Sequence, residues 1–252
     1  MTLHRFFVAR QSIEGGTVTI AGEIAHQIAD VLRMTAGEHI LVLDNSGWQM
    51  ETELSYVSGS RVVGQIVRRS LARGEPRIKV SLYQGMLQSR NLEFVLQKGT
   101  ELGIVEFVPI ISSRCVIANL EDVNKKLERW ERIVREAAEQ SRRGRLPLIE
   151  PATFFQQACE RARHAGGLFL MPWEEERTVS LHSMLTSAPL PFTISLFIGP
   201  EGGFSEDEVQ IARGYGARTV SLGPRVLRAE TAGLVAASAM FYESGDLNPL
   251  PE

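Results

Sequence analysis

Two glycine-containing loops near the C-terminus carry the residues best placed for chemistry. Each follows an apolar stretch typical of a buried strand: Thr193–Ile198 leads into Gly-Pro-Glu-Gly-Gly-Phe at 199–204, and Thr219–Leu222 leads into Gly-Pro-Arg-Val-Leu-Arg at 223–228. Glycine lets the backbone come close to a ligand, and proline stiffens the loop. In open α/β sheets, ligands bind beyond the carboxyl ends of the strands. The two loops therefore predict a site for a small ligand that is held largely by main-chain groups.

The candidate catalytic residues are Glu201 in the first loop and Arg228 in the second. An arginine there could neutralise negative charge that develops during a reaction, and a glutamate is a candidate acid or base. Other roles stay open at this point. Glu201 could instead close its loop by accepting backbone N–H groups, and Arg228 could instead pair with a cofactor carboxylate or form a structural ion pair.

The sequence lacks the motifs of several common nucleotide-binding and catalytic sites. The sequence has no G-x-x-x-x-G-K-[ST], no G-x-G-x-x-G after a strand and no G-x-S-x-G. None of its five histidines stands at metal-ligand spacing from cysteines or carboxylates, so we expect no metal site. The pattern favours chemistry performed by a bound organic cofactor together with positioned charges.

The elements that must position these residues change character along the chain. Short strands fill the first seventy or so residues and predict a small barrel or sandwich: Phe6–Val8, Thr17–Ile20, His39–Asp44, Glu51–Tyr56 and Arg61–Val67. One helix is expected among them, from Glu23 to Met34, with Ile24, Ile28, Val31 and Leu32 on one face and Gly37 ending it.

After the linker-like segment 70–77, buried strands alternate with helices. Strands are expected at 78–85, 105–111, 169–171 and 193–198, and helices at 91–102, 123–141 and 229–242. Such alternation predicts an α/β domain with a parallel sheet. We therefore expect two domains, residues 1–72 and 73–252.

Two long stretches of this sequence resemble the signature motifs of the RsmE family of bacterial ribosomal RNA methyltransferases, in the SPOUT superfamily. They are Ile198–Ser205 and Leu222–Ala232, and shorter matches lie at Val31–Met34, Lys98–Gly103 and Glu139–Ser141. The resemblance covers nearly the whole chain. It implies methylation of N3 of a specific uridine in small-subunit (16S) rRNA, with S-adenosylmethionine as the methyl donor. The alternative is the same fold acting on another RNA position, a ribose 2′-hydroxyl or a tRNA base.

The resemblance also implies a fold and a set of cofactor contacts. The N-terminal domain would be a PUA-like β-barrel, the C-terminal domain a SPOUT-type parallel sheet with a trefoil knot, and the molecule a homodimer with its site near the interface. A third loop, Pro172-Trp173-Glu174, would join the two glycine loops. The cofactor-binding residues carried over by motif are Met171, Pro172, Gly199, Pro200, Glu201, Gly202, Leu222, Gly223, Leu227, Arg228, Thr231 and Ala232.

A uridine that reacts in a loop-built pocket must leave its stack, so the RNA must be held on both sides of it. Arginine suits phosphate contacts, and it makes up 23 of the 27 basic residues although the net charge is -3. The candidate RNA-binding residues are Arg5, Arg10, Arg33, Arg68, Arg69, Arg114, Arg142, Arg143 and Arg145. The substrate would be the rRNA, free or within an assembled ribosomal particle.

Compared with the family, this sequence has Asp30 where relatives usually carry a basic residue, and Arg142 where many have glycine. Both differences concern the RNA footprint. The chain has two cysteines, Cys115 and Cys159, and no apolar run of the roughly 18–20 residues that a membrane span requires. We therefore expect a protein of the reducing cytoplasm without a membrane partner.

Overall fold

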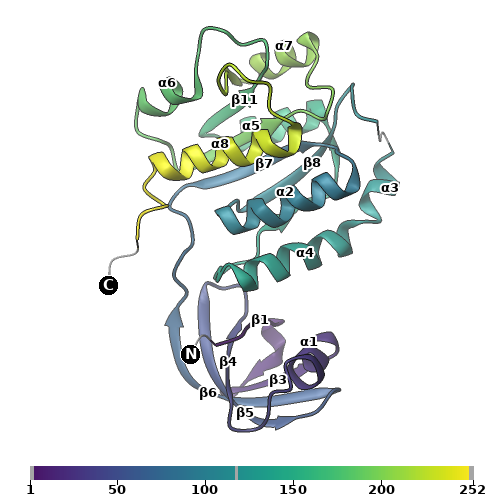
Figure 1. The fold of residues 1–252 in the computed structure, drawn as a ribbon, viewed down its shortest axis with the longest axis vertical. Helices are drawn as coiled ribbons and strands as arrows, with labels where there is room; N and C mark the ends of the chain where they lie inside the picture. Colours follow the sequence, from purple (N-terminus) through teal and green to yellow (C-terminus); the bar gives the residue numbers. More distant parts are fainter. Residues whose placement is uncertain (1–2, 117–118, 250–252) are drawn as a thin grey trace. The chain divides into compact units, whose positions relative to one another are not determined.

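The structure, a computed structural model, describes residues 3–116 and 119–249, and the chain divides into two compact units (Figure 1). The first unit comprises the chain up to Glu75 together with Ala138–Leu146. The second comprises Pro76–Ala137 and the chain from Pro147 onward. A single boundary at residues 72 and 73 therefore does not describe the division, because nine residues from the middle of the chain belong to the first unit.

The first unit is built on a six-stranded sheet in the order β1–β4–β5–β6–β3–β2. Only β1 and β4 pair in parallel; the other neighbours are antiparallel. Alternate side chains, such as Val18 and Ile20, enter one buried cluster, as expected of strands with one face on a core. The strands are β1 (Arg5–Phe7), β2 (Ile13–Glu14), β3 (Thr17–Ala21), β4 (His39–Leu43), β5 (Trp48–Val57) and β6 (Arg61–Leu71), with a 3₁₀ turn η1 at Arg10–Ser12.

The helix expected from Glu23 to Met34 is shorter and irregular. An α-helical turn, α1 (Glu23–His26), passes into a π-helical turn, η2 (Gln27–Val31), in which the Leu32 amide donates to the Gln27 carbonyl. The wider turn shifts the faces of the helix. Ile28 is buried as predicted, but Val31 is 65% exposed, so the prediction of Val31 on the buried face is wrong.

The second unit is built on a seven-stranded sheet in which every pairing is parallel. The order is β10–β8–β7–β12–β11–β13, with β9 also paired to β8. This sheet confirms the predicted α/β class. The strands are β7 (Lys79–Gly85), β8 (Glu106–Ile111), β9 (Leu148–Ile149), β10 (Thr153–Phe154), β11 (Leu168–Pro172), β12 (Thr193–Ile198) and β13 (Arg218–Val220).

Helices cover both faces of this sheet. Side chains of α2, α4, α6 and α8 share one apolar cluster with the sheet, and side chains of α5 and α7 share the other. Figure 1 shows α8 lying beside α2 in front of β7. The helices are α2 (Ser89–Leu102), α3 (Leu120–Asn124), α4 (Leu127–Gln140), α5 (Phe155–Ala165), α6 (Leu181–Thr186), α7 (Glu206–Gly214) and α8 (Ala229–Glu243).

The single helix expected at 123–141 is thus two helices, α3 and α4. Throughout the described ranges, no helix combines the length and apolar character needed to cross a membrane.

The register of the parallel sheet sets the place of the site. Gln84 of β7 pairs with Ile198 of β12, and Pro172 of β11 pairs with Val220 of β13. All strands point the same way, so their carboxyl ends lie on one edge. The loops after β7, β11, β12 and β13 all leave from this edge.

Candidate functional site

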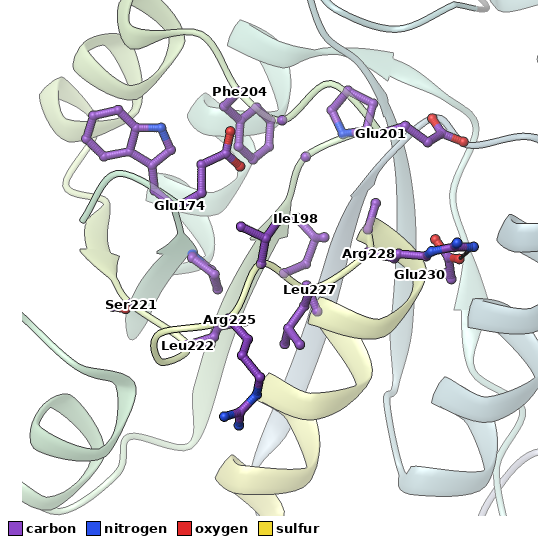
Figure 2. A pocket seen from close by; sticks show the side chains of 18 of the residues that line it. Glu174, Ile198, Glu201, Phe204, Ser221, Leu222, Arg225, Leu227, Arg228 and Glu230 are labelled. Atoms are coloured by element: carbon purple, nitrogen blue, oxygen red, sulfur yellow. Dashed lines mark ion pairs between the residues drawn. The ribbon is translucent and has the colours of Figure 1, made fainter. Parts of the chain in front are cut away.

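A cavity of about 680 Å³ lies at the carboxyl edge of the sheet of the second unit (Figure 2). Three loops form its walls, after β11, β12 and β13, and Asn91 of α2 joins them. Both glycine loops singled out in the sequence therefore face one cavity. Its lining residues are Asn91, Pro172, Trp173, Glu174, Arg177, Ile198, Gly199, Pro200, Glu201, Gly202, Gly203, Phe204, Ser221, Leu222, Gly223, Pro224, Arg225, Val226, Leu227, Arg228, Ala229, Glu230 and Ala232.

The first loop lies tightly against the end of β7. A Cβ atom at Gly85 would lie 2.4 Å from the backbone nitrogen of Pro200, a distance that no side chain can occupy. The buried Gln84 side chain donates from Nε2 to the Gly199 carbonyl at 3.3 Å. Within the loop, the Gly203 amide donates to the Pro200 carbonyl at 2.9 Å, and Gly203 has a φ of 67°. Glycine is needed at Gly85 because the backbone of Pro200 approaches it there, and at Gly203 because of the positive φ.

Glu201 closes this loop onto α2. Its Oε1 accepts a hydrogen bond from the backbone N–H of Gln88 at 3.1 Å, immediately before the helix begins. Of the two roles left open for Glu201, this geometry supports the loop-closing acceptor. The side chain is exposed and also lines the cavity, so the contact does not remove it from the reach of a ligand.

Arg114, placed by the sequence among the RNA contacts, braces the first loop. Its Nη1 donates to the carbonyls of Gly202 at 2.9 Å and Phe204 at 3.5 Å. The adjacent Ser113 amide donates to Glu208 at 2.7 Å, and Glu208 also accepts from the Ser205 amide at the start of α7. Ser205 and Glu208 form a capping box at the start of α7, and these contacts fix the outer side of the loop.

The second loop turns at Gly223, which has a φ of 107° and donates its amide to Ser221 Oγ at 3.2 Å. It ends at Arg228, the residue that precedes α8. The Arg228 side chain is 87% exposed, and its Nη1 lies 3.9 Å from Oε1 of Glu230. Figure 2 shows Arg228, Glu230 and Glu201 on one side of the cavity and Glu174 on the other.

The third wall is a segment that we call the arch, residues 173–181, between β11 and the start of α6. Trp173, Glu174 and Arg177 line the cavity from it. The carboxylate of Glu174 lies against the first loop, because a Cβ atom at Gly203 would be 2.9 Å from its Oε1. The third predicted loop, Pro172-Trp173-Glu174, is thus part of the cavity wall.

The chemical character of the lining is mixed. Ile198, Phe204, Leu222 and Leu227 offer apolar contact, while three carboxylates and three guanidinium groups balance in formal charge. Exposed main chain from the glycine loops supplies donors and acceptors. This combination suits a ligand that has a flat apolar part and carries both signs of charge.

Ten of the twelve predicted cofactor residues line the cavity. Met171 and Thr231 do not, and Met171 is fully buried in the core between the sheet, α5 and α7. Among the lining residues, only Asn91 and Arg177 lie outside the strands, loops and motifs that the sequence indicated. The position of Arg177 follows from β11, which ends at the same edge of the sheet. Nothing in the sequence indicated that Asn91 of α2 would reach the cavity.

The predicted RNA-binding arginines differ in their surroundings. All of them except Arg114 lie in the first unit. Arg10, Arg33, Arg68, Arg69, Arg142 and Arg145 are exposed. Arg5 is half-buried, donates to Gln49 Oε1 at 3.0 Å, and has a pKa lowered by burial and by the nearby charge of Arg142.

Arg143 needs a correction, because its side chain is only 3% exposed. Its Nε and Nη2 donate to the two carboxylate oxygens of Glu75 at 3.0 and 2.9 Å. Glu75 Oε1 also accepts from the amides of Gly144 at 2.9 Å and Arg145 at 3.2 Å. Burial tends to raise the pKa of Glu75, but these hydrogen bonds and the Arg143 charge lower it overall. The structure therefore gives Arg143 the role of fixing 138–146 within the first unit, and we withdraw it from the RNA contacts.

In the portions of the chain that the structure describes, no three His, Cys, Asp or Glu side chains gather as a group that could hold a metal ion.

Comparisons with known proteins identify the family. Residues 74–241 match the model of the RNA methyltransferase domain family. The chain is 34% identical over 250 residues to the ribosomal RNA small subunit methyltransferase E of Bacillus subtilis, covering 96% of this chain and 97% of the relative. It is 34% identical over 233 residues to the protein of the same name from Synechocystis, covering 92% of this chain and 75% of that one.

A solved structure supports the same family. A ribosomal RNA small subunit methyltransferase E from Neisseria gonorrhoeae, bound to S-adenosyl methionine, superposes with a TM-score of 0.85 at 30% identity, covering 95% of this chain and 97% of that one. The family resemblance predicted from the motifs is confirmed. The chain belongs to the RNA methyltransferase domain family and, within it, to the ribosomal RNA small subunit methyltransferase E (RsmE) family.

Proposed function

We propose that this protein transfers a methyl group from S-adenosylmethionine to N3 of a uridine in small-subunit (16S) rRNA. The observation that carries the proposal is the cavity at the carboxyl edge of the parallel sheet, where both motif loops and the arch converge. Relatives that match this chain along nearly its whole length are named ribosomal RNA small subunit methyltransferases, and two similar structures contain S-adenosylmethionine.

The cavity fits S-adenosylmethionine in size and chemistry. Its apolar residues offer a surface for an adenine ring, and its paired signs of charge suit the ammonium and carboxylate of a methionine moiety. When bound, the cofactor supplies a methyl group activated by a sulfonium. The residues that would hold it are those of the two glycine loops and the arch.

The protein must then prepare the uridine. N3 gains a usable lone pair only when its proton leaves, and it must lie about 3 Å from the methyl carbon, opposite the sulfur. Arg228 stands at the cavity with its guanidinium exposed, 3.9 Å from the Glu230 carboxylate. In this position it would stabilise the negative charge of the uracil ring as the proton is lost. Glu201, on the same side of the cavity in Figure 2, is the candidate acceptor of that proton.

The RNA would be held outside the cavity by exposed arginines. Those of the first unit are Arg10, Arg33, Arg68, Arg69, Arg142 and Arg145, with Arg5 partly accessible; Arg114 stands beside the first loop. We propose that the first unit is a PUA-like β-barrel that serves as the RNA-binding domain. The substrate would be met in the cytoplasm, as rRNA that is either free or within an assembled ribosomal particle.

We further propose a SPOUT-type trefoil knot in the second unit. The end of β13 is hydrogen-bonded on both sides by the arch: Trp173 N–H donates to Val220 at 3.0 Å, and Ser221 N–H donates to Val179 at 2.8 Å. The chain then continues into α8, which packs on β7 and β12. In a knotted chain, the last segment passes through a loop formed earlier in the sequence. The contacts of the arch on both sides of β13, just before α8, support such threading.

A homodimer is proposed from the surface of α8. The helix buries Ala236, Ala237 and Phe241 against the sheet, yet Val235 and Tyr242 remain 42% and 75% exposed on it. Its only charged residues are Glu230 and Glu243 near its ends. A helix that is apolar on all sides is normally covered on all sides, and a second copy of this chain would cover it beside the cavity.

The decisive experiment has two stages. Purified protein is first titrated with S-adenosylmethionine by calorimetry, and absence of binding would refute the proposal. The protein is then incubated with the labelled cofactor and small-subunit rRNA or ribosomal particles that lack the modification, and the nucleosides are separated by mass spectrometry. We expect N3-methyluridine. A 2′-O-methylated nucleoside, or methylation of tRNA only, would keep the fold but transfer the assignment to another RNA position.

A further inference from the structure

Glu176 is a nearly buried carboxylate in the arch that does not line the cavity. Its side chain is 8% exposed. Oε1 accepts hydrogen bonds from the Thr178 amide at 2.8 Å, the Thr178 hydroxyl at 2.5 Å and the Val179 amide at 3.3 Å. These three contacts fold the arch around the carboxylate.

The other oxygen of Glu176 reaches out of the arch. Oε2 accepts from the Thr219 hydroxyl of β13 at 2.7 Å and lies 3.6 Å from Nη2 of Arg213 on α7. The same Arg213 nitrogen donates to Thr219 Oγ1 at 2.9 Å. One carboxylate therefore ties the arch to the strand that the arch encloses and to the helix before that strand.

The same group of residues supports the cavity wall. The Arg213 guanidinium lies 5.7 Å from the centre of the Trp173 ring, within the range of a cation–π contact. Trp173, Glu174 and Arg177 immediately flank Glu176 and line the cavity. A shift of the arch would move all three lining residues, including the Glu174 carboxylate that faces Gly203.

We propose that Glu176 is a positioning residue that holds the arch against β13 and α7, so that this wall of the cofactor cavity is already in its binding geometry before the ligand arrives. The inference rests on the proposed function, because it assigns the cavity to the cofactor. Preorganisation of this kind raises affinity: if the arch adopts the binding geometry in only a tenth of molecules, the apparent Kd rises tenfold.

The ionisation of Glu176 agrees with this role. Hydrogen bonds, first from the Thr178 hydroxyl and then from its amide and from Thr219, lower its pKa to about 2. The carboxylate is therefore charged at neutral pH, where it keeps its contact with Arg213.

The test compares three variants with the wild type. Glu176→Ala removes every contact, Glu176→Gln keeps an acceptor but loses the charge, and Thr219→Val removes only the tie to β13. Glu175→Gln is the matched control, since Glu175 is the exposed acid next along the arch. The Kd for S-adenosylmethionine is measured by calorimetry at a temperature where circular dichroism shows every variant folded, and KM for the cofactor and kcat are measured with rRNA.

We expect Glu176→Ala to raise the Kd and the KM for the cofactor at least about tenfold while kcat at saturating cofactor changes little. Glu176→Gln and Thr219→Val should show smaller rises, and Glu175→Gln none. Variants that melt at lower temperature but bind the cofactor like the wild type would overturn the positioning role. If Glu176→Ala does not fold, the outcome for Glu176→Gln and Thr219→Val decides in the same way. A wild type that does not bind the cofactor would instead refute the proposed function.

Discussion

Replacing Arg143 with methionine should destabilise the first unit and should not act mainly on RNA. Methionine is close to arginine in length, so the change removes the guanidinium without opening a large cavity. It leaves the Glu75 carboxylate, 18% exposed, without the two hydrogen bonds from Arg143. Glu75 keeps the amides of Gly144 and Arg145 as donors.

The magnitude follows from burial. Removing one partner of a buried ion pair typically costs about 3–5 kcal/mol, and the two remaining amide donors place this site at the low end, about 3 kcal/mol. In a unit of this size each kcal/mol lowers the melting temperature by roughly 4–8 °C. We therefore expect the transition of the first unit to fall by at least ~12 °C.

The assay is differential scanning calorimetry with urea unfolding followed by circular dichroism. Arg69→Met on β6 is the control, because Arg69 is an exposed arginine of the same unit and should change stability by less than about 0.5 kcal/mol. The double variant Glu75→Gln with Arg143→Met should recover part of the loss, since no unpaired charge is left buried.

Measurements of stability and RNA binding together provide the result that would contradict this reasoning. If Arg143→Met melts within a few degrees of the wild type, and the slope of log affinity against log salt falls by about one ion, Arg143 is a phosphate contact. That pair of results would refute the argument from burial. Arg142→Met, at the neighbouring exposed position, should instead weaken RNA binding and flatten the salt dependence.

Three further results are expected. Arg228→Ala should lower kcat by about 10²–10³ with the protein folded. A raised cofactor KM at unchanged kcat would instead assign Arg228 to the cofactor carboxylate. Arg163→Ala is the control, because Arg163 is an exposed arginine of α5 that does not line the cavity. Gly85→Ala forces a Cβ to 2.4 Å from the Pro200 nitrogen and should cost about 1–3 kcal/mol and at least tenfold in cofactor Kd, while Gly214→Ala, with open space at its Cβ, should do neither. Glu176 has a pKa of about 2 in the folded protein against an ordinary 4.5, so the stability that its charge contributes is complete above pH 4.5 and is lost as the pH falls towards 2. The difference in unfolding free energy between the wild type and Glu176→Gln should therefore close over that interval in an acid titration. A difference that does not depend on pH would contradict this prediction.

The cavity was predictable from the sequence because its two main walls are local features. A buried strand followed by a glycine loop is visible along the chain, and the parallel sheet then brings the carboxyl ends together. The strand-rich first unit was predictable for a similar reason, since period-two alternation at Thr17–Ala21 and its neighbours reports one buried face.

What could not be predicted depends on contacts between distant residues. Three arginines in four residues look like a charged surface, and nothing near them in sequence shows that Glu75, almost seventy residues earlier, buries Arg143. Arg114 likewise looks like a free basic residue until it meets the carbonyls of Gly202 and Phe204. The π-helical turn at Gln27–Val31 changes the helical period, so a face drawn at regular spacing misplaces Val31.

The pairing of β12 with β7 has a consequence for the order in which the protein becomes active during its synthesis. Ser195 lies beside Ser81, more than a hundred residues earlier, and apart from Asn91 every cavity residue comes from position 172 or later. The three strands that complete the sheet, β11, β12 and β13, all come from position 168 or later, so β7 lacks one neighbour until the last third of the chain emerges. Such long-range pairing slows folding. A chain interrupted before β13 would contain a nearly complete sheet and no second glycine loop, so translation itself delays cofactor binding until the final helix has been made.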